Sequence, residues 1–298
     1  MMYHNPVMLE ESIKSLDIKS DGVYVDLTFG GGGHSNAILK YLGKNGKLFA
    51  FDQDLDSLRN EIKDERFILI NQNFKFLKQN LIYYGHKYVD GILGDLGVSS
   101  FQIDQPERGF SLRFNTKLDM RMNISKETTA ADILNNYSEK ELSSILYEYS
   151  DIKNSRFIAK LIINARKKAK INSTNKFNEI LNPIFNKRNQ NKTLAKIYQA
   201  LRIEVNEEIK VLKDLLIQLP DVLKKNGKVT IITYHSVEDR LVKRFFNNGC
   251  FGIEPIKDQF GNTKTPLKKC FKFKKPSKEE IEKNSRSRSA KLRCAIRL

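Results

Sequence analysis

Residues 23–54 read VYVDLTFGGGGHSNAILKYLGKNGKLFAFDQD, where two apolar runs, each ending in an acid, are separated by four glycines and a helical pattern. The acids are Asp26 and Asp52. A strand that leads into glycines and a helix lets backbone N–H groups approach a ligand closely, because glycine has no Cβ and accepts positive φ. An acid after the next strand can accept hydrogen bonds from ribose hydroxyls. The stretch therefore predicts a pocket for an adenosine-type cofactor.

The spacing of the glycines indicates which cofactor this is. The dinucleotide fingerprint requires a third glycine three residues after the second, and this position is Ser35 counted from Gly30 and Asn36 counted from Gly31. The NAD pattern therefore fails in both registers. The pattern that is present is an acid after the first strand, a glycine loop and an acid after the second strand. This pattern suits S-adenosylmethionine, which has no pyrophosphate and carries a charged amino-acid tail. The alternative is a glycine-rich surface turn.

Strand and helix patterns alternate over roughly the first hundred residues, which predicts a doubly wound, mainly parallel α/β sheet. The expected strands are Val23–Asp26, Lys47–Phe51, Phe67–Ile70 and Val89–Leu93. The expected helices are His34–Leu42, Leu55–Ile62 and Phe74–Tyr84. Ligands bind at the carboxyl ends of the strands in such sheets, where Asp26, Asp52 and Asp95 fall.

The middle of the chain has only helical patterns, so we expect an all-helical domain over residues 105–196, inserted between sheet parts 1–104 and 197–298. Expected helices of the insertion include Ala130–Leu134, Ser138–Tyr149 and Arg156–Lys168, with polar or basic stretches at Arg166–Lys176 and Asn186–Lys192. After it, a long helix with an apolar face from Leu201 to Leu219, a turn at Asn226–Gly227, a strand at Val229–Thr233 and a helix at Val237–Phe246 are expected.

Composition limits the partners. Fifty-two Lys and Arg against 35 Asp and Glu give a formal charge of +17, which favours a polyanion such as nucleic acid. Three separated cysteines, Cys250, Cys270 and Cys294, indicate neither a zinc site nor a disulfide framework. No apolar run has the length of a membrane span, and we expect a soluble, cytoplasmic protein without a metal.

Several strings of the chain resemble, in order, those of the bacterial RsmH (MraW) family of ribosomal RNA methyltransferases. They are DLTFGGGGHS, FDQD, GDLGVSS followed by FQ, ERGFS, LDMRM, YQALRIEVNEE, YHSVEDR and RSRSAKLR. The likeness runs from His4 to the last residues and is weakest in the helical insertion and over Phe251–Lys275.

The resemblance implies a class I, Rossmann-like methyltransferase fold, S-adenosylmethionine as methyl donor, and methylation of the N4 amine of a cytidine in the decoding region of 16S ribosomal RNA. It implies that the partner is the small ribosomal subunit, and it leaves a homodimer as one alternative for the oligomeric state. The cofactor-binding positions that the resemblance transfers are Gly32, Gly33, His34, Asp52, Phe74, Asp95 and Gln102. Gly31 departs from many relatives, which carry a larger residue there.

The chemistry of the acceptor favours an amine or an oxygen. Methylation of a cytosine carbon would require a cysteine nucleophile near the fourth strand, and none of the three cysteines lies there. Asp95 is a candidate acceptor for the amino hydrogens, but Asp95 is followed by Leu96-Gly97 rather than by the prolines and aromatic residue of related amino-methyltransferases. A purely cofactor-binding role of Asp95 is therefore an equal alternative.

His235 is the second catalytic candidate, because a histidine at the end of the fifth strand can accept the proton released by the amine. The alternative is structural: Ser236 caps the next helix, Asp239 completes a capping box, and His235 packs nearby.

A basic segment near the C-terminus carries the argument for an RNA substrate. Phe271 and Phe273 lie among lysines 264, 268, 269, 272, 274 and 275 and are followed by Arg286, Arg288, Lys291 and Arg293. Lysines neutralise phosphates and aromatic rings stack on unpaired bases, although the alternation also suits a half-buried strand. Rival functions are a DNA or protein methyltransferase and a non-catalytic assembly factor.

Overall fold

The computed structural model describes residues 6–185, 190–252, 257, 259–261 and 265–298, which form two compact units. The first unit combines the described residues up to Gly97 with Ile209–Leu298, and the second is Val98–Glu208. The boundaries thus lie at 97/98 and 208/209, rather than at the 104/105 and 196/197 expected from the sequence.

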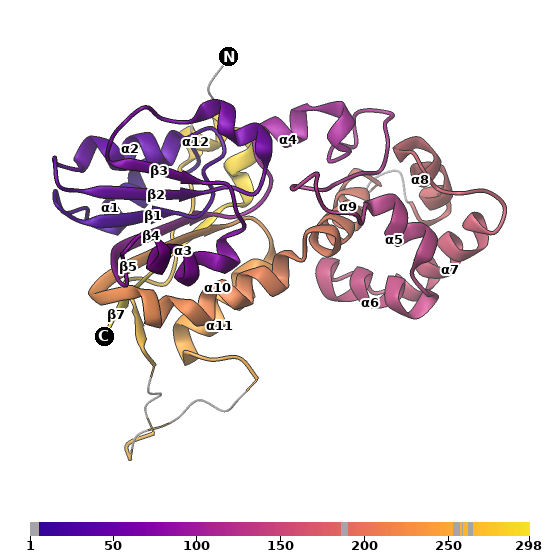
Figure 1. Cartoon of the computed structure of the whole chain (residues 1–298). Coiled ribbons are helices and arrows are strands. Elements are labelled where there is room, and N and C mark those ends of the chain that lie inside the picture. The colour runs from indigo at the N-terminus through magenta and orange to yellow at the C-terminus, as the bar shows by residue number, and fades with distance from the viewer. Residues whose placement is uncertain (1–5, 186–189, 253–256, 258, 262–264) are drawn as a thin grey trace. The chain divides into compact units, whose positions relative to one another are not determined.

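The first unit is built around one seven-stranded sheet with the strand order β3-β2-β1-β4-β5-β7-β6 (Figure 1). Its strands are β1 (Val23–Asp26), β2 (Lys47–Phe51), β3 (Phe67–Ile70), β4 (Val89–Asp95), β5 (Leu223–Thr233), β6 (Leu267–Lys269) and β7 (Lys291–Arg297). The five strands β1 to β5 are parallel, whereas β7 is antiparallel to both β5 and β6. The sheet confirms the predicted doubly wound, mainly parallel fold.

Helices cover both faces of this sheet, which explains why its strands are continuous apolar runs in the sequence. On one face Val25 and Phe49 pack with residues of α3 (Leu77–Tyr83), α10 (Glu208–Val222) and α11 (Ser236–Asn248). On the other, Tyr24 and Leu48 pack with residues of α1 (Leu9–Leu16) and α2 (Gly33–Tyr41). The unit is completed by α12 (Lys278–Lys283) and by the 3₁₀ helices η1 (Leu55–Asn60), η2 (Phe74–Phe76) and η5 (Ser285–Ser289).

The second unit is helical in its described part and has a separate core of buried apolar residues that includes Leu142, Ile158 and Phe177. Its elements are α4 (Ser100–Asp104), η3 (Pro106–Arg108), α5 (Ala130–Asn136), α6 (Glu139–Ser150), α7 (Ser155–Arg166), α8 (Thr174–Leu181), η4 (Asn182–Ile184) and α9 (Gln190–Asn206). The helices expected near residues 130, 138 and 156 are present. Part of the basic stretch Asn186–Lys192, residues 186–189, lies outside the described residues.

Two expected helices of the first unit have a different form. The segment expected as a helix over Leu55–Ile62 is the shorter 3₁₀ helix η1. The segment expected over Phe74–Tyr84 begins with the single 3₁₀ turn η2 and becomes α-helical only at Leu77.

The prediction of one long helix between Leu201 and Leu219 is wrong, because the helix is interrupted at Glu207, whose φ is 52°. The buried Asn206 side chain accepts a hydrogen bond from Met122 N at 2.7 Å and donates to Met120 O at 2.8 Å. These contacts tie the end of α9 to a segment distant in sequence.

The turn expected at Asn226–Gly227 is also wrong, because both residues lie inside β5. The pairing register of β5 with β4 shifts between Val89 and Gly91, and Asn226 has a φ of 64°. The two residues therefore form an irregularity within a strand rather than its start.

Among the described residues, no helix combines the length and the apolar character that crossing a membrane requires.

Candidate functional site

The glycine loop and the acid after β2 are joined by hydrogen bonds at the carboxyl edge of the sheet. The carboxylate of Asp52 accepts from Gly30 N at 2.8 Å and from Asp54 N at 2.9 Å. Burial raises the pKa of Asp52 to about 6, although both N–H groups lower it. Asn60, on η1, also donates to Gly30 O at 3.0 Å. The loop conformation and the position of the Asp52 carboxylate are therefore fixed together.

Asp26, at the end of β1, binds residues on both sides of the glycine loop. Its fully buried carboxylate accepts hydrogen bonds from Ser35 Oγ at 2.7 Å and from Thr28 N at 3.1 Å. Burial raises the pKa of this carboxyl group, and the nearby His34 and Ser35 lower it. Asp26 thus connects the end of β1 to the first turn of α2.

His34 lies at the start of α2 and is held by the N-terminal segment. Its ring is buried, and Nε2 lies 3.1 Å from Val7 O, to which it donates. The other ring nitrogen, Nδ1, lies 3.9 Å from Oδ2 of Asp95. Pro6 packs beside Gly33, where an added Cβ would lie 2.2 Å from Pro6 Cγ. Gly33 is therefore required for this close approach.

Asp95, at the end of β4, has protein partners on both its backbone and its side chain. Its Oδ1 accepts from the hydroxyl of Tyr234 at 2.6 Å, and its backbone N donates to Thr28 Oγ1 at 2.8 Å. Burial raises the pKa of Asp95 to about 6, while His34 and the Tyr234 hydroxyl lower it. The Asp95 side chain is 22% exposed, so it is only partly buried.

The loop itself suits S-adenosylmethionine. Gly30 and Gly32 have φ values of 52° and 75°, which residues with a Cβ rarely adopt. A Cβ at Gly31 would meet no atom within 4 Å, so the loop borders open space there. The carboxylates of Asp52 and Asp95 offer hydrogen-bond acceptors for ribose hydroxyls and for a charged amino group. The open glycine loop and these two acceptor groups therefore fit the cofactor.

The remaining expected cofactor residues lie in different parts of the fold. Phe74 begins η2, just after β3, and packs partly against the sheet core. Gln102 belongs to the second unit, where it is buried in α4 and forms a capping box with Ser99. Gly32, Gly33, His34, Asp52, Phe74 and Asp95 all belong to the first unit.

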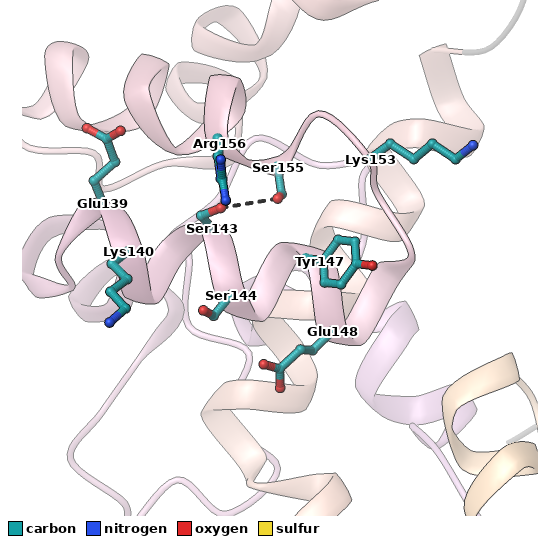
Figure 2. A pocket seen from close by; sticks show the side chains of 9 residues that line it. All are labelled: Glu139, Lys140, Ser143, Ser144, Tyr147, Glu148, Lys153, Ser155 and Arg156. Atoms are coloured by element: carbon teal, nitrogen blue, oxygen red, sulfur yellow. Dashed lines mark hydrogen bonds between the residues drawn. The ribbon is translucent and has the colours of Figure 1, made fainter.

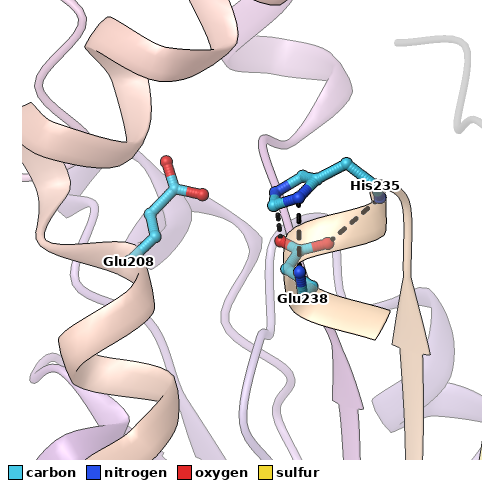
Figure 3. A group of neighbouring side chains, drawn as sticks. All are labelled: Glu208, His235 and Glu238. Atoms are coloured by element: carbon cyan, nitrogen blue, oxygen red, sulfur yellow. Dashed lines mark hydrogen bonds and ion pairs between the residues drawn. The ribbon is translucent and has the colours of Figure 1, made fainter. Parts of the chain in front are cut away.

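His235 is the N-cap of α11, and this corrects the expected cap at Ser236 (Figure 3). His235 Nδ1 accepts from Glu238 N at 3.4 Å, and Nε2 lies 3.0 Å from Glu238 Oε1. The box partner is therefore Glu238 rather than Asp239. Glu208, which Figure 3 also draws, pairs with Arg202 at 2.8 Å within the second unit.

The family model described as the MraW methylase family matches residues 1–298. The chain belongs to the MraW methylase family. Membership confirms the family resemblance seen in the sequence motifs and the methyltransferase class that it implied.

Three curated relatives of this family member are named ribosomal RNA small subunit methyltransferase H. The protein from Christiangramia forsetii is 54% identical over 298 residues, which is 100% of this chain and 99% of the relative. That from Flavobacterium johnsoniae is 52% identical, with the same coverage of both chains. That from Cytophaga hutchinsonii is 50% identical over 99% of this chain and 100% of the relative.

The basic C-terminal segment of this MraW family member is partly structural. The buried Arg293 donates to Asp239 Oδ1 at 2.7 Å and lies 5.5 Å from the centre of the Phe273 ring. Lys291 also binds Asp239, at 2.9 Å. Between residues 265 and 275 only Leu267–Lys269 form a strand; Lys274 makes an isolated bridge to Leu292, and Lys264 lies outside the described residues.

Two of the cysteines lie together, which sequence spacing did not indicate. Cys270 and Cys294 are adjacent because β6 pairs with β7, and their sulfur atoms are 3.3 Å apart. Both are free thiols; Cys270 is exposed and Cys294 is buried.

An open pocket of about 730 Å³ lies in the second unit, between α6 and α7 (Figure 2). Its lining includes three basic side chains, Lys140, Lys153 and Arg156, and two acidic ones, Glu139 and Glu148. None of the predicted site residues lines it. The mixed charge gives the pocket no marked preference for an anion.

Proposed function

We propose that this MraW family member transfers a methyl group from S-adenosylmethionine to the N4 amine of a cytidine in the decoding region of 16S ribosomal RNA. The observation that carries the proposal is the hydrogen bond from Gly30 N to Asp52, beside Asp95 at the same edge of the sheet. Family membership along the whole chain supports the reaction class.

The cofactor, when bound, supplies an electrophilic methyl group. Gly32, Gly33 and His34 would provide the loop, Asp52 would accept from the ribose hydroxyls, and Phe74 would offer an apolar surface. Asp95 and Gln102 complete the proposed binding set. Most of these side chains are already positioned by protein contacts, which limits the ordering needed on binding.

For the acceptor, Asp95 is the better catalytic candidate. An oxygen that binds the amino hydrogens of cytidine would localise the nitrogen lone pair, and the partly exposed Asp95 carboxylate has this capacity. His235 is a weaker candidate, because its Nδ1 accepts from Glu238 N as the cap of α11 and its Nε2 is buried, 3.0 Å from Glu238 Oε1. We therefore assign His235 to helix capping.

The proposed substrate is the small ribosomal subunit, and the helical unit is proposed to contact this substrate. A formal charge of +17 favours association with RNA, and a cytidine would have to leave its stack to reach the reactive edge. The proposed location is the cytoplasm, where these subunits are made. A homodimer stays a prediction that sedimentation would test.

The test is methyl incorporation from labelled S-adenosylmethionine into purified small subunits that lack the modification, followed by identification of the labelled nucleoside. N4-methylated cytidine is the expected product. Label in DNA or protein would support a rival methyltransferase, and no label despite cofactor binding would support the assembly-factor alternative.

A further inference from the structure

Tyr234 directly follows β5 and places its hydroxyl against the proposed acceptor carboxylate. The hydroxyl donates to Asp95 Oδ1 at 2.6 Å, which is a short bond to a charged acceptor. The sequence motifs indicated His235, the next residue, as a catalytic candidate and not Tyr234. The side chain that contacts Asp95 is thus that of Tyr234.

The position of Tyr234 is fixed from several sides. Its backbone N donates to Glu238 Oε2 at 2.9 Å, so the helix cap also holds the tyrosine. Its ring packs against the buried cluster of Val7, Met8, Ile232, Ala290 and Leu292. A Cβ added at Gly97 would lie 3.4 Å from Tyr234 Cδ2. These contacts hold the ring in place, with its hydroxyl within hydrogen-bond distance of Asp95 Oδ1.

We propose that Tyr234 is a positioning residue for the proposed methyl transfer, which holds Asp95 through Oδ1 and leaves Oδ2 to accept from a bound amino group. The inference rests on the proposed function. The amino group belongs either to the tail of the methyl donor or to the cytidine, and binding and turnover measurements distinguish the two.

The charge on Asp95 gives the inference a measurable consequence. The groups that act on Asp95 are His34 from α2, Asp26 from β1, Glu238 from α11 and Tyr234 itself. The Tyr234 hydrogen bond favours the ionised carboxylate, whereas the two acids disfavour it. Glu280 of α12 in turn acts on Tyr234. Loss of the hydroxyl therefore raises the pKa of Asp95.

The experiment compares Tyr234→Phe with wild type over pH 5.5–9, since Phe retains the ring packing. Single-turnover methyl transfer to small subunits and the Kd for S-adenosylhomocysteine are measured at each pH. In Tyr234→Phe, the acid limb of the pH profile of the single-turnover rate, or of the affinity for S-adenosylhomocysteine, is expected to move up by about one pH unit. This shift corresponds to about a tenfold loss of that rate or affinity at the lowest pH values. A shift in the rate alone assigns Oδ2 to the cytidine, and a shift in the Kd as well assigns it to the donor.

Tyr137→Phe is the matched control, because the Tyr137 hydroxyl donates to Glu204 at 2.9 Å within the second unit. It loses a similar tyrosine–carboxylate bond and should leave the acid limb in place. In an Asp95→Asn background, Tyr234→Phe should produce no further pH shift. An unshifted limb in Tyr234→Phe, while wild type is active, overturns the inference. An inactive wild type that also binds no product overturns the proposed function instead.

Discussion

The backbone N–H of Gly30 donates to Asp52 Oδ2 at 2.8 Å, which links the glycine loop after β1 to the acid after β2. The second Asp52 oxygen accepts from Asp54 N at 2.9 Å. Because each carboxylate oxygen has a further lone pair, Asp52 can hold the loop and still accept from a ligand. The conformation of the loop and the position of the Asp52 carboxylate, the proposed ligand-binding group, therefore depend on each other.

Asp52→Asn should weaken binding of S-adenosylhomocysteine by about ten- to a hundredfold, because hydrogen bonds to a charged acceptor contribute about 1.5–3 kcal/mol. The amide retains the size of the side chain but removes the charge and one acceptor. Equilibrium dialysis gives the Kd.

The control for this variant is Asp64→Asn, which breaks the Asp64–Arg66 ion pair away from the loop. Its Kd should equal that of wild type. A wild-type Kd for Asp52→Asn would contradict the assignment of Asp52 to cofactor binding.

The contribution of Asp52 and Asp95 to the stability of the ligand-free protein should fall as the pH rises from about 4 to about 6. Burial raises the pKa values of Asp52 and Asp95 from 3.8 to about 6, so the folded state binds more protons than the unfolded state over this interval. Their contribution is fully present below the unfolded pKa and is lost through the folded pKa. Urea unfolding at several pH values measures it.

Asp52→Asn provides the check on this pH dependence. The variant should show a flatter decrease in the free energy of unfolding than wild type, since one of the titrating groups is gone. Equal slopes for the two proteins would show that Asp52 titrates normally in the folded state.

Two glycines of the loop, Gly31 and Gly33, should respond differently to alanine. Gly31→Ala should retain cofactor binding and stability, because a Cβ there meets nothing within 4 Å. Gly33→Ala should destabilise the protein by about 1–3 kcal/mol, because its Cβ would overlap Pro6. Thermal unfolding and product binding of both variants test this, and similar losses at the two positions would contradict the loop geometry.

Cys270 should react with iodoacetamide at a rate that reaches half its maximum near pH 7. The thiolate is the nucleophile, and the hydrogen bond with Cys294 lowers the pKa of Cys270 to about 7. Cys294 is buried and has a raised pKa, so it should stay unmodified. Peptide mass spectrometry over pH 6–9 separates the sites, and a midpoint near pH 9 would contradict the pairing of the thiols.

The strands of the parallel sheet could be predicted closely from the sequence. Val23–Asp26, Lys47–Phe51 and Phe67–Ile70 have the bounds that their apolar runs indicated, because strands buried on both faces leave an uninterrupted apolar signal. The placement of Asp26, Asp52 and Asp95 at one edge followed from the same alternation.

Contacts between distant segments could not be predicted in this way. The helix break at Glu207 depends on Asn206 binding the Met120–Met122 backbone, and the cysteine pair depends on β6 meeting β7. Tyr234 acquires its proposed role only through its contact with Asp95, which is 139 residues away in the chain. A motif identifies such residues but does not give their partners.

Calorimetric titration of the folded chain with S-adenosylmethionine tests directly whether the glycine loop and its acids bind the methyl donor. We expect saturable binding to one site at pH 7.5, and we expect Asp52→Asn to weaken it. Absence of heat and of any competing uptake of S-adenosylhomocysteine, both with and without small ribosomal subunits, would contradict it.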